Sequence, residues 1–534
     1  MPERFIGDSS YLNAKSTTGT ATRVKDVSSA SGLCPICIRD CSTLCEVGLS
    51  AFRGREVLYP EPHRFGESTQ GALKGFWIDW AHFNIQPRLR ETDGVKLDPD
   101  QAIFPNVDVS TKVGKTALKL PILIGAYGST EVARIYWKGL AAGAALCGII
   151  MTIGENVCGM DSEARFREGK VIHSEELKKR VEEFRRFWDG EHGDVAVQTN
   201  VEDKRLGVDE YVLSKLEVNI IERKWGQGAK AIGGEVRLWS LEKALELKKR
   251  GYIVLPDPED KTVQEAFQAG VFKSFERHSR VGAVDEERFL EEVDELRAQG
   301  ARQVTLKTGA YGIADVAFTM RLASKAKLDY VTFDGAEGGT GMSPVPMIDE
   351  VGTPVVHLEA HLLRCARLLE KKGKHVPDLV IAGGFIVESQ IFKAIAMSNF
   401  GTHPYVKAVL MGRSPLTAVM KANYFLELAR EGRLPKTFTD LYGDQPEKFF
   451  ISGPMLKATM VGRGKVPWEA VGLYGYLNDR IGVGLQQLMA GCRKWRLSLL
   501  SREDIASLTP RAKDVTGIPL YEDVLDQDLE EALD

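Results

Sequence analysis

The sequence lacks three features that would assign it to large classes of protein: a long apolar run, an excess of one charge and a secretory leader. Its best apolar candidate, residues 139–154, is shorter than the roughly 18–20 residues of a membrane span. The net charge of −4 gives no general attraction to nucleic acid or anionic membranes. The start, MPERFIGDSS, has no basic stretch followed by an apolar one. We therefore expect a cytoplasmic protein with no membrane or nucleic-acid partner.

Cysteine is scarce, with eight residues in 534, but half of them lie in one stretch. Residues 32–48, GLCPICIRDCSTLCEVG, place Cys34, Cys37, Cys41 and Cys45 at a C-x2-C-x3-C-x3-C spacing. In a reducing compartment, clustered thiols indicate metal binding or catalysis more often than disulfides. Four thiolates suit a 4Fe–4S cluster. Zinc is the main alternative, although zinc ribbons usually have two separated C-x2-C pairs.

The pattern of the chain changes twice, and this predicts three regions. Residues 1–118 form a polar N-terminal arm and a cysteine-rich iron–sulfur region. Residues 119–430 alternate short apolar runs with helix-period segments. Residues 431–534 are a C-terminal extension with an acidic tail.

Eight apolar, β-branched runs in the middle region are predicted to be strands. They span residues 120–126, 147–153, 194–200, 218–224, 303–308, 329–335, 378–384 and 406–412. Most lack apolar/polar alternation, which is typical of strands buried on both faces of a parallel sheet. Helical patterns lie between them, as in 174–188 and 285–299.

Eight strand–helix units predict an α/β fold, a (β/α)8 TIM barrel with N- and C-terminal extensions. An open doubly wound sheet is the alternative, but GAYGST (125–130) after the first strand does not supply G-x-G-x-x-G. The long segment 225–302 is predicted to be an insertion over the active-site end.

In such a barrel, the functional residues lie at the carboxyl ends of the strands. Gly383, Gly384 and Gly412 end the seventh and eighth strands and precede helices, so their backbone N–H groups can hold a phosphate, with Arg413 adding a charge. Lys307 ends the fifth strand and is a candidate cation for negative charge that develops on a ring or an enolate. Together these residues indicate a phosphate-bearing cofactor such as FMN.

The same residues belong to longer motifs: GQGAK (226–230), the run from 304 to 344 that contains DGAEGGTGMSP, IAGGF (381–385) and LMGRSPL (410–416). With these motifs in order, residues 119–430 resemble the FMN-binding synthase domain of the glutamate synthase large (alpha) subunit. The C-terminal stretch 481–509 resembles the archaeal-type, shorter members of that family.

The resemblance implies that reduced FMN passes a hydride to the imine that 2-oxoglutarate forms with ammonia. It implies a phosphate site, ring contacts and a closing loop made by Ala126, Tyr127, Gly128, Gln227, Lys307, Gly335, Gly339, Gly383, Gly384, Gly412 and Arg413. It assigns catalytic roles to Lys307, Lys230 and Gln227, with Lys230 as the leading candidate for binding the carboxylates of the acid.

Three departures from the family pattern bear on the reaction. The chain begins Met-Pro, without a nucleophilic cysteine or a glutaminase domain, so ammonia is expected to be free or delivered by a partner chain. GENVCGMDSE (154–163) replaces a GEGGE-like run, and residues 412–425 lack the family's iron–sulfur cysteines. The substrate therefore stays open: it is 2-oxoglutarate or another 2-oxo acid, with ammonia or a methylamine as the amine, or an unrelated compound.

The N-terminal cysteine quartet would then be the relocated entry point for electrons, which a cluster passes singly to the flavin. Without a dinucleotide fingerprint of its own, the chain is expected to form an oligomer with an electron-donor subunit or to accept electrons from ferredoxin.

Two other functions remain open. A 2-hydroxy acid oxidase-like FMN enzyme needs a histidine base at a strand end, and none of the nine histidines falls at one. A non-catalytic subunit that only holds FMN and a cluster would not need Gln227, Lys230 and Lys307.

Overall fold

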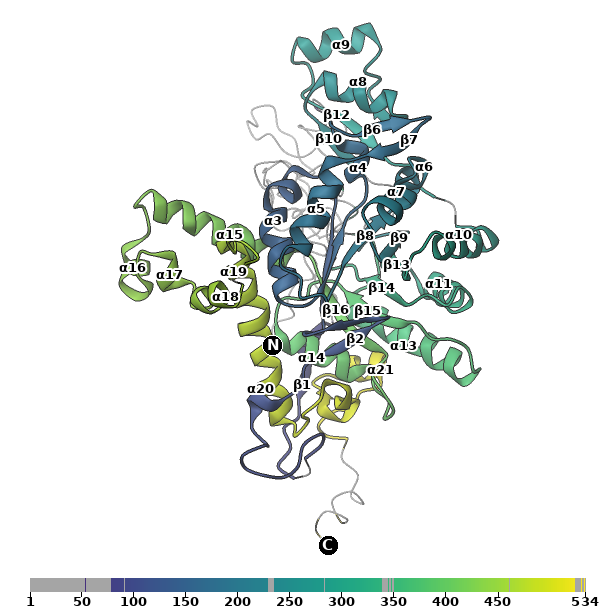
Figure 1. Cartoon of the computed structure of the whole chain (residues 1–534). Helices are drawn as coiled ribbons and strands as arrows, with labels where there is room; N and C mark the ends of the chain where they lie inside the picture. The colour runs from purple at the N-terminus through teal and green to yellow at the C-terminus, as the bar shows by residue number, and fades with distance from the viewer. Residues whose placement is uncertain are drawn as a thin grey trace, which may run out of the picture.

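The fold is given by a computed structural model (Figure 1). It describes Arg53 and residues 78–90, 92–228, 235–282, 284–338, 344, 347, 350–460, 462–523, 530 and 533. The cysteine quartet at Cys34, Cys37, Cys41 and Cys45, together with Lys230 and Gly339, lies outside these residues.

Eight parallel strands close into a barrel, in the order β13-β14-β15-β16-β4-β5-β8-β9. They are β4 (Ile122–Tyr127), β5 (Ile150–Ile153), β8 (Val195–Thr199), β9 (Ile220–Lys224), β13 (Gln303–Thr308), β14 (Tyr330–Asp334), β15 (Asp378–Ala382) and β16 (Val406–Met411). Each predicted run coincides with one barrel strand, although β4 ends one residue beyond its predicted run, so the predicted barrel is confirmed and the open sheet is excluded.

The interior of the barrel is packed rather than hollow. Side chains from successive strands, among them Leu123, Ile150 and Val380, form a buried cluster along its axis. Val113 of β2 (Thr111–Val113) and Leu118 of β3 (Thr116–Leu118) join that cluster, and both are fully buried. The other end of the barrel, at the carboxyl ends of the strands, is lined by polar groups.

Helices surround the strands (Figure 1). The principal ones are α3 (Glu131–Leu146), α5 (Glu175–Arg185), α7 (Val208–Lys215), α10 (Glu286–Ala298), α11 (Ile313–Lys325), α13 (Val355–Lys371), α14 (Glu388–Met397) and α15 (Arg413–Arg430). α5 begins as its sequence predicts, because the Ser174 hydroxyl accepts the Leu177 N–H at 3.4 Å. Leu177, Val181 and Phe184 on its apolar stripe are buried.

The insertion after β9 folds into a small unit of its own. β10 (Glu235–Leu238), β11 (Ile253–Leu255) and β12 (Phe275–His278) form an antiparallel sheet in the order β10-β12-β11, with α8 (Leu241–Lys249) and α9 (Lys261–Gln268) beside it. Figure 1 shows this unit at the top of the molecule, next to the hairpin of β6 (Arg165–Arg167) and β7 (Lys170–His173). Its inner residues line the cavity described below.

The C-terminal region packs along the barrel and beneath it. α19 (Trp468–Tyr474) lies against α3 and α15, and a β-carbon at Gly143 of α3 would come within 2.7 Å of the Leu473 side chain. The helix continues through a π-helical segment, Gly475–Gly482, into α20 (Val483–Gly491). β17 (Ile505–Ser507) then pairs with β1 (Phe83–Ile85), so residues from both predicted extensions share one small sheet.

Three short helices, α16 (Lys436–Tyr442), α17 (Pro446–Phe449) and α18 (Gly453–Thr459), project to the side of the barrel (Figure 1). No described helix combines the length and apolar character needed to cross a lipid bilayer.

The region boundaries at residues 118 and 430 stay predictions.

Candidate active site

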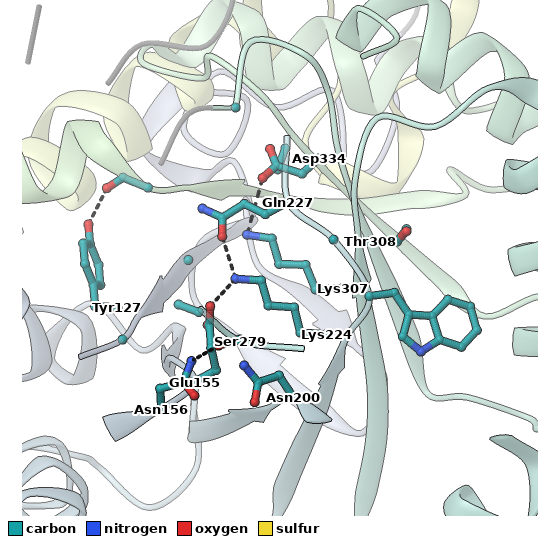
Figure 2. Close-up of a pocket in the computed structure, with 18 of the residues that line it drawn as sticks. Tyr127, Glu155, Asn156, Asn200, Lys224, Gln227, Ser279, Lys307, Thr308 and Asp334 are labelled. Atoms are coloured by element: carbon teal, nitrogen blue, oxygen red, sulfur yellow. Dashed lines mark hydrogen bonds and ion pairs between the residues drawn. The ribbon is translucent and has the colours of Figure 1, made fainter. Parts of the chain in front are cut away.

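A cavity of about 2110 Å³ opens at the carboxyl ends of the barrel strands (Figure 2). Residues in or directly after all eight strands line it. From β4 round to β16 they include Tyr127, Glu155, Asn200, Lys224, Lys307, Asp334, Gly383 and Gly412. Parallel strands bring these residues together because every strand ends on the same rim.

Lys307 is a buried cation at the barrel mouth. Its Nζ lies 3.5 Å from Oδ2 of Asp334, and both side chains are more than nine-tenths buried. Burial raises the pKa of Asp334, and the charge of Lys307 opposes that rise. Burial also raises the pKa of Glu222, with Lys307 again opposing, while Gln198 Nε2 donates to Glu222 Oε1 at 2.6 Å. Lys307 is therefore fixed beside two buried carboxyl groups.

A second lysine, Lys224, orients the residues next to it. Its Nζ donates to Oε1 of Glu155 at 2.5 Å and to Oε1 of Gln227 at 2.7 Å. Figure 2 shows this chain of contacts running from Gln227 through Lys224 to Glu155, beside Lys307. The side-chain carbonyl of Gln227 is therefore directed at Lys224.

Arg180 of α5 anchors the end of β4. Its Nη1 donates to the carbonyls of Tyr127 and Gly128, each at 2.9 Å, while its Nε pairs with Glu176 at 2.8 Å. The Tyr127 hydroxyl in turn donates to the carbonyl of Gly412. Burial raises the pKa of Tyr127 well above its ordinary value, so the phenol stays protonated as the donor. These contacts tie β4 to the junction of β16 and α15.

That junction and the end of β15 form a cradle of backbone. Gly383 and Gly384 have φ of +123° and +74°, values that favour glycine. α15 is 18 residues long and begins after Gly412 with no side-chain cap, and a β-carbon at Gly412 would meet nothing within 4 Å. The first N–H groups of such a helix attract anions. The cradle (Gly383, Gly384, Gly412 and the start of α15) therefore fits a phosphate.

Two neighbours complete the cradle. Arg413, the first residue of α15, is partly buried beside Tyr127, and burial lowers the pKa of its guanidinium. Ser414 Oγ donates to the carbonyl of Phe385 at 3.2 Å, which joins the two loops.

The structure gathers most of the predicted site residues into this one cavity. Ala126, Tyr127, Gly128, Gln227, Lys307, Gly383, Gly384, Gly412 and Arg413 all line it. Gly335 is not among the lining residues, but it packs against Gly383: its Cα lies 3.2 Å from where a β-carbon on Gly383 would be. The positions support the predicted roles of these residues, which stay predictions.

Sequence reasoning missed several groups that shape the cavity. Lys224 is the last residue of a predicted strand and Asp334 the last but one of another, and a position at a strand end is the signal that singled out Lys307. Arg180 and Tyr476 gave no such signal, because each reaches the cavity region from a helix distant in sequence. Over the described residues, no group of three or more His, Cys, Asp or Glu side chains could hold a metal ion.

Residues 276–416 match the family model described as a conserved region in glutamate synthase, which confirms the resemblance predicted from the motifs. The chain is 25% identical over 320 residues to the archaeal glutamate synthase (NADPH) of Archaeoglobus fulgidus, covering 59% of this chain and 50% of that protein. It is 34% identical over 95 residues to the archaeal-type enzyme of Thermotoga neapolitana, 18% of this chain and 17% of that one. The chain thus spans half or less of these relatives.

Solved structures with a similar arrangement include a mutant flavocytochrome b2 with pyruvate bound, at 13% identity and a TM-score of 0.44, covering 87% of this chain and 86% of that chain. A soluble mutant of the membrane-associated (S)-mandelate dehydrogenase from Pseudomonas putida has 15% identity and a TM-score of 0.42, over 82% and 93% of the two chains.

The carboxyl group of Glu337 generates a pH prediction. Its Oε2 accepts the Val355 N–H at 2.8 Å, and burial raises its pKa from 4.5 to about 7. The folded protein therefore holds a proton there that the unfolded chain releases, so stability falls as pH rises from about 4.5 to 7. In Glu337→Gln, the decrease in the free energy of unfolding over this pH range should be smaller than in the wild type by up to about 3 kcal/mol.

Chemical denaturation at several pH values, with the exposed Glu291→Gln as the control, measures this effect. A wild-type and Glu337→Gln difference in unfolding free energy that stays constant across pH 4.5–7 would contradict it.

Proposed function

We propose that this chain is an FMN-dependent oxidoreductase of the glutamate synthase type, which reduces the imine of 2-oxoglutarate or a related 2-oxo acid to the amino acid. One observation carries the proposal: a buried cation, Lys307, and a phosphate-sized backbone cradle line the same cavity at the barrel mouth. The region that matches glutamate synthase, residues 276–416, contains both.

The residues present fit FMN. Gly383, Gly384 and the start of α15 would hold its phosphate through backbone N–H groups, with Arg413 adding a charge. Ala126–Gly128, Gln227 and Lys307 would face its ring from β4, β9 and β13. Bound there, reduced FMN supplies the hydride for an imine carbon.

Lys307 is suited to stabilise negative charge that develops at the barrel mouth. Its ammonium group is held in place before any reaction by Asp334 and lies away from bulk water, where a fixed charge acts most strongly. Lys224 keeps Gln227 and Glu155 in one orientation, so neither side chain has to be ordered when substrate arrives. Lys230 stays the proposed partner of an acid carboxylate.

The alternatives are less well supported. Among the described residues that line the cavity there is no histidine, the base that a 2-hydroxy acid oxidase-like enzyme requires. A subunit that only transferred electrons would have no use for Lys224, Gln227 and Lys307, which all face the cavity. Both observations favour an enzyme acting on the CH–NH2 group of an amino acid.

Electrons would enter through a 4Fe–4S cluster on Cys34, Cys37, Cys41 and Cys45, because four thiolates are the ligand set that such a cluster takes. The other four cysteines are free and scattered, and Cys147, Cys158 and Cys492 are buried. A partner subunit that oxidises NAD(P)H, or ferredoxin, would reduce the cluster. Ammonia would be free or come from a glutaminase subunit.

The cluster proposal predicts about four iron atoms per chain after anaerobic purification, with broad visible absorption beneath the flavin bands. Cys41→Ala should lose the iron and keep FMN, since the cradle lies on the barrel. Cys365→Ala, which changes a partly exposed cysteine elsewhere, is the matched control. Metal analysis that finds one zinc per chain, or no metal, would contradict the cluster.

The reaction predicts its own product. Anaerobic incubation of the FMN-loaded protein with dithionite, 2-oxoglutarate and ammonia should yield glutamate, and methylamine in place of ammonia should yield N-methylglutamate if that amine is the substrate. Mass spectrometry identifies the product, and protein stripped of FMN serves as the blank. Formation of 2-hydroxyglutarate instead, or no product with any 2-oxo acid, would exclude the proposed function.

A further inference from the structure

Arg277 of β12 is a buried cation that has no ion-pair partner among the described residues. Its side chain belongs to a residue that is 1% exposed, and its only hydrogen bond among the described residues runs from Nη1 to Ser279 Oγ at 2.8 Å. Within the described part of the chain, Nε has no partner. The nearby carboxylates of Glu155, Asp203 and Glu202 act on the Arg277 charge without forming an ion pair with it. Because arginine stays protonated in proteins, this burial is costly unless an anion offsets it.

Three other cations that line the same cavity are paired with carboxylates. The pairs are Lys224 with Glu155 at 2.5 Å, Arg223 with Asp209 at 2.7 Å and Arg280 with Glu202 at 2.9 Å. Arg277 thus differs from these neighbours because no described carboxylate forms an ion pair with it.

Asn156, Asn200, Arg277 and Ser279 all line the cavity, and we call these four residues the Arg277 subsite. Asn156 Nδ2 donates to Ser279 Oγ at 3.4 Å, a contact drawn in Figure 2 beside Glu155 and Asn200. This contact joins the segment after β5 to Ser279, the residue that directly follows β12.

Asn156 itself is held firmly. Its φ of 64° is uncommon for a residue other than glycine, and its N–H donates to both carboxylate oxygens of Asp203, at 3.1 and 3.0 Å. Tyr252 Oη donates to Asn156 Oδ1 at 3.4 Å, and the Tyr252 ring lies 5.1 Å from the Arg277 guanidinium. The subsite is therefore built into the fold.

The order of the barrel strands separates this subsite from the cradle. β8, which leads into Asn200, stands four places from β15 in the closed ring of eight strands, and so opposite the strand that leads into Gly383 and Gly384. Arg277 is supplied from the insertion rather than from a barrel strand. An anion bound by Arg277 is thus a different group from the phosphate at the cradle.

We propose that the Arg277 subsite binds the distal carboxylate of a 2-oxo dicarboxylic acid and so selects a dicarboxylate over a monocarboxylate. The inference rests on the proposed function, because the reacting carbon must lie near Lys307 and Gln227 at the barrel mouth. A carboxylate held by the insertion is then the one at the far end of the acid. A guanidinium offers paired donors to a carboxylate, which suits this recognition.

The test compares 2-oxoglutarate with 2-oxopentanoate, which has a methyl group in place of the distal carboxylate. Calorimetric titration of the FMN-loaded protein gives the dissociation constant of each acid without turnover. Arg277→Gln should lower the affinity for 2-oxoglutarate by about 10- to 100-fold, which is the range for the loss of a charged hydrogen bond. The affinity for 2-oxopentanoate should not change. Arg277→Lys should restore part of the affinity.

Arg288→Gln is the matched control, because Arg288 lines the same cavity but its side chain is 73% exposed. Its affinity for both acids should equal that of the wild type. The melting temperature of unliganded Arg277→Gln should not fall, because the variant removes a buried charge that has no ion-pair partner among the described residues. A lower melting temperature with both affinities unchanged would mean a purely structural role and would overturn the inference.

The outcomes separate this inference from the proposed function. The inference is overturned if Arg277→Gln binds 2-oxoglutarate as tightly as the wild type, or if it lowers the affinity for both acids equally. In either case the proposed function still stands, provided that the wild-type protein binds the acids. A wild-type protein that binds neither acid overturns both.

Discussion

The ion pair of Lys307 with Asp334 is the interaction on which the site depends. Lys307 lies opposite Lys224 in the β13–β9 register and opposite Thr332 in the β13–β14 register, so closure of the barrel forces two lysines together at its mouth. Each lysine has its own carboxylate, Asp334 for Lys307 and Glu155 for Lys224. Breaking the Lys307–Asp334 pair would leave a buried charge without its partner, which typically costs about 3–5 kcal/mol. The pairs therefore fix where a cation can face a bound group.

Three parts of the chain contribute residues to the cavity around this ion pair. The barrel supplies the lysines and the cradle, and the insertion adds Arg277 above the opposite strands. The C-terminal region contributes Tyr476 from its π-helical segment, whose hydroxyl donates to the carbonyl of Ile386 beside the cradle. π-helical turns occur frequently at functional sites, and here the turn brings a distant helix to the rim of the cavity. The cavity is thus assembled from segments far apart in sequence.

The sequence predicted what depends on local pattern. Strands buried on both faces leave continuous apolar runs, so all eight barrel strands were found, and the residue that ends each strand was known to lie on one rim. The sequence could not predict contacts that close across long loops: Asn156 meets Ser279 across 123 residues, and Arg180 reaches Gly128 across 52. The pairing of β1 with β17 joins the two ends of the described chain in the same way. The hydrophobic periodicity of a sequence carries no information about which distant segments will contact each other.

The central claim is that the charge of Lys307 faces the ring of a bound flavin. Spectroelectrochemical titration of the FMN-loaded protein tests it most directly, because a nearby cation stabilises the negative charge of reduced flavin. Lys307→Met should bind FMN and shift the midpoint potential of the flavin to a more negative value, whereas Lys325→Met, at a lysine whose side chain is 51% exposed, should leave it unchanged. A Lys307→Met protein that retains FMN at the wild-type potential would contradict the claim.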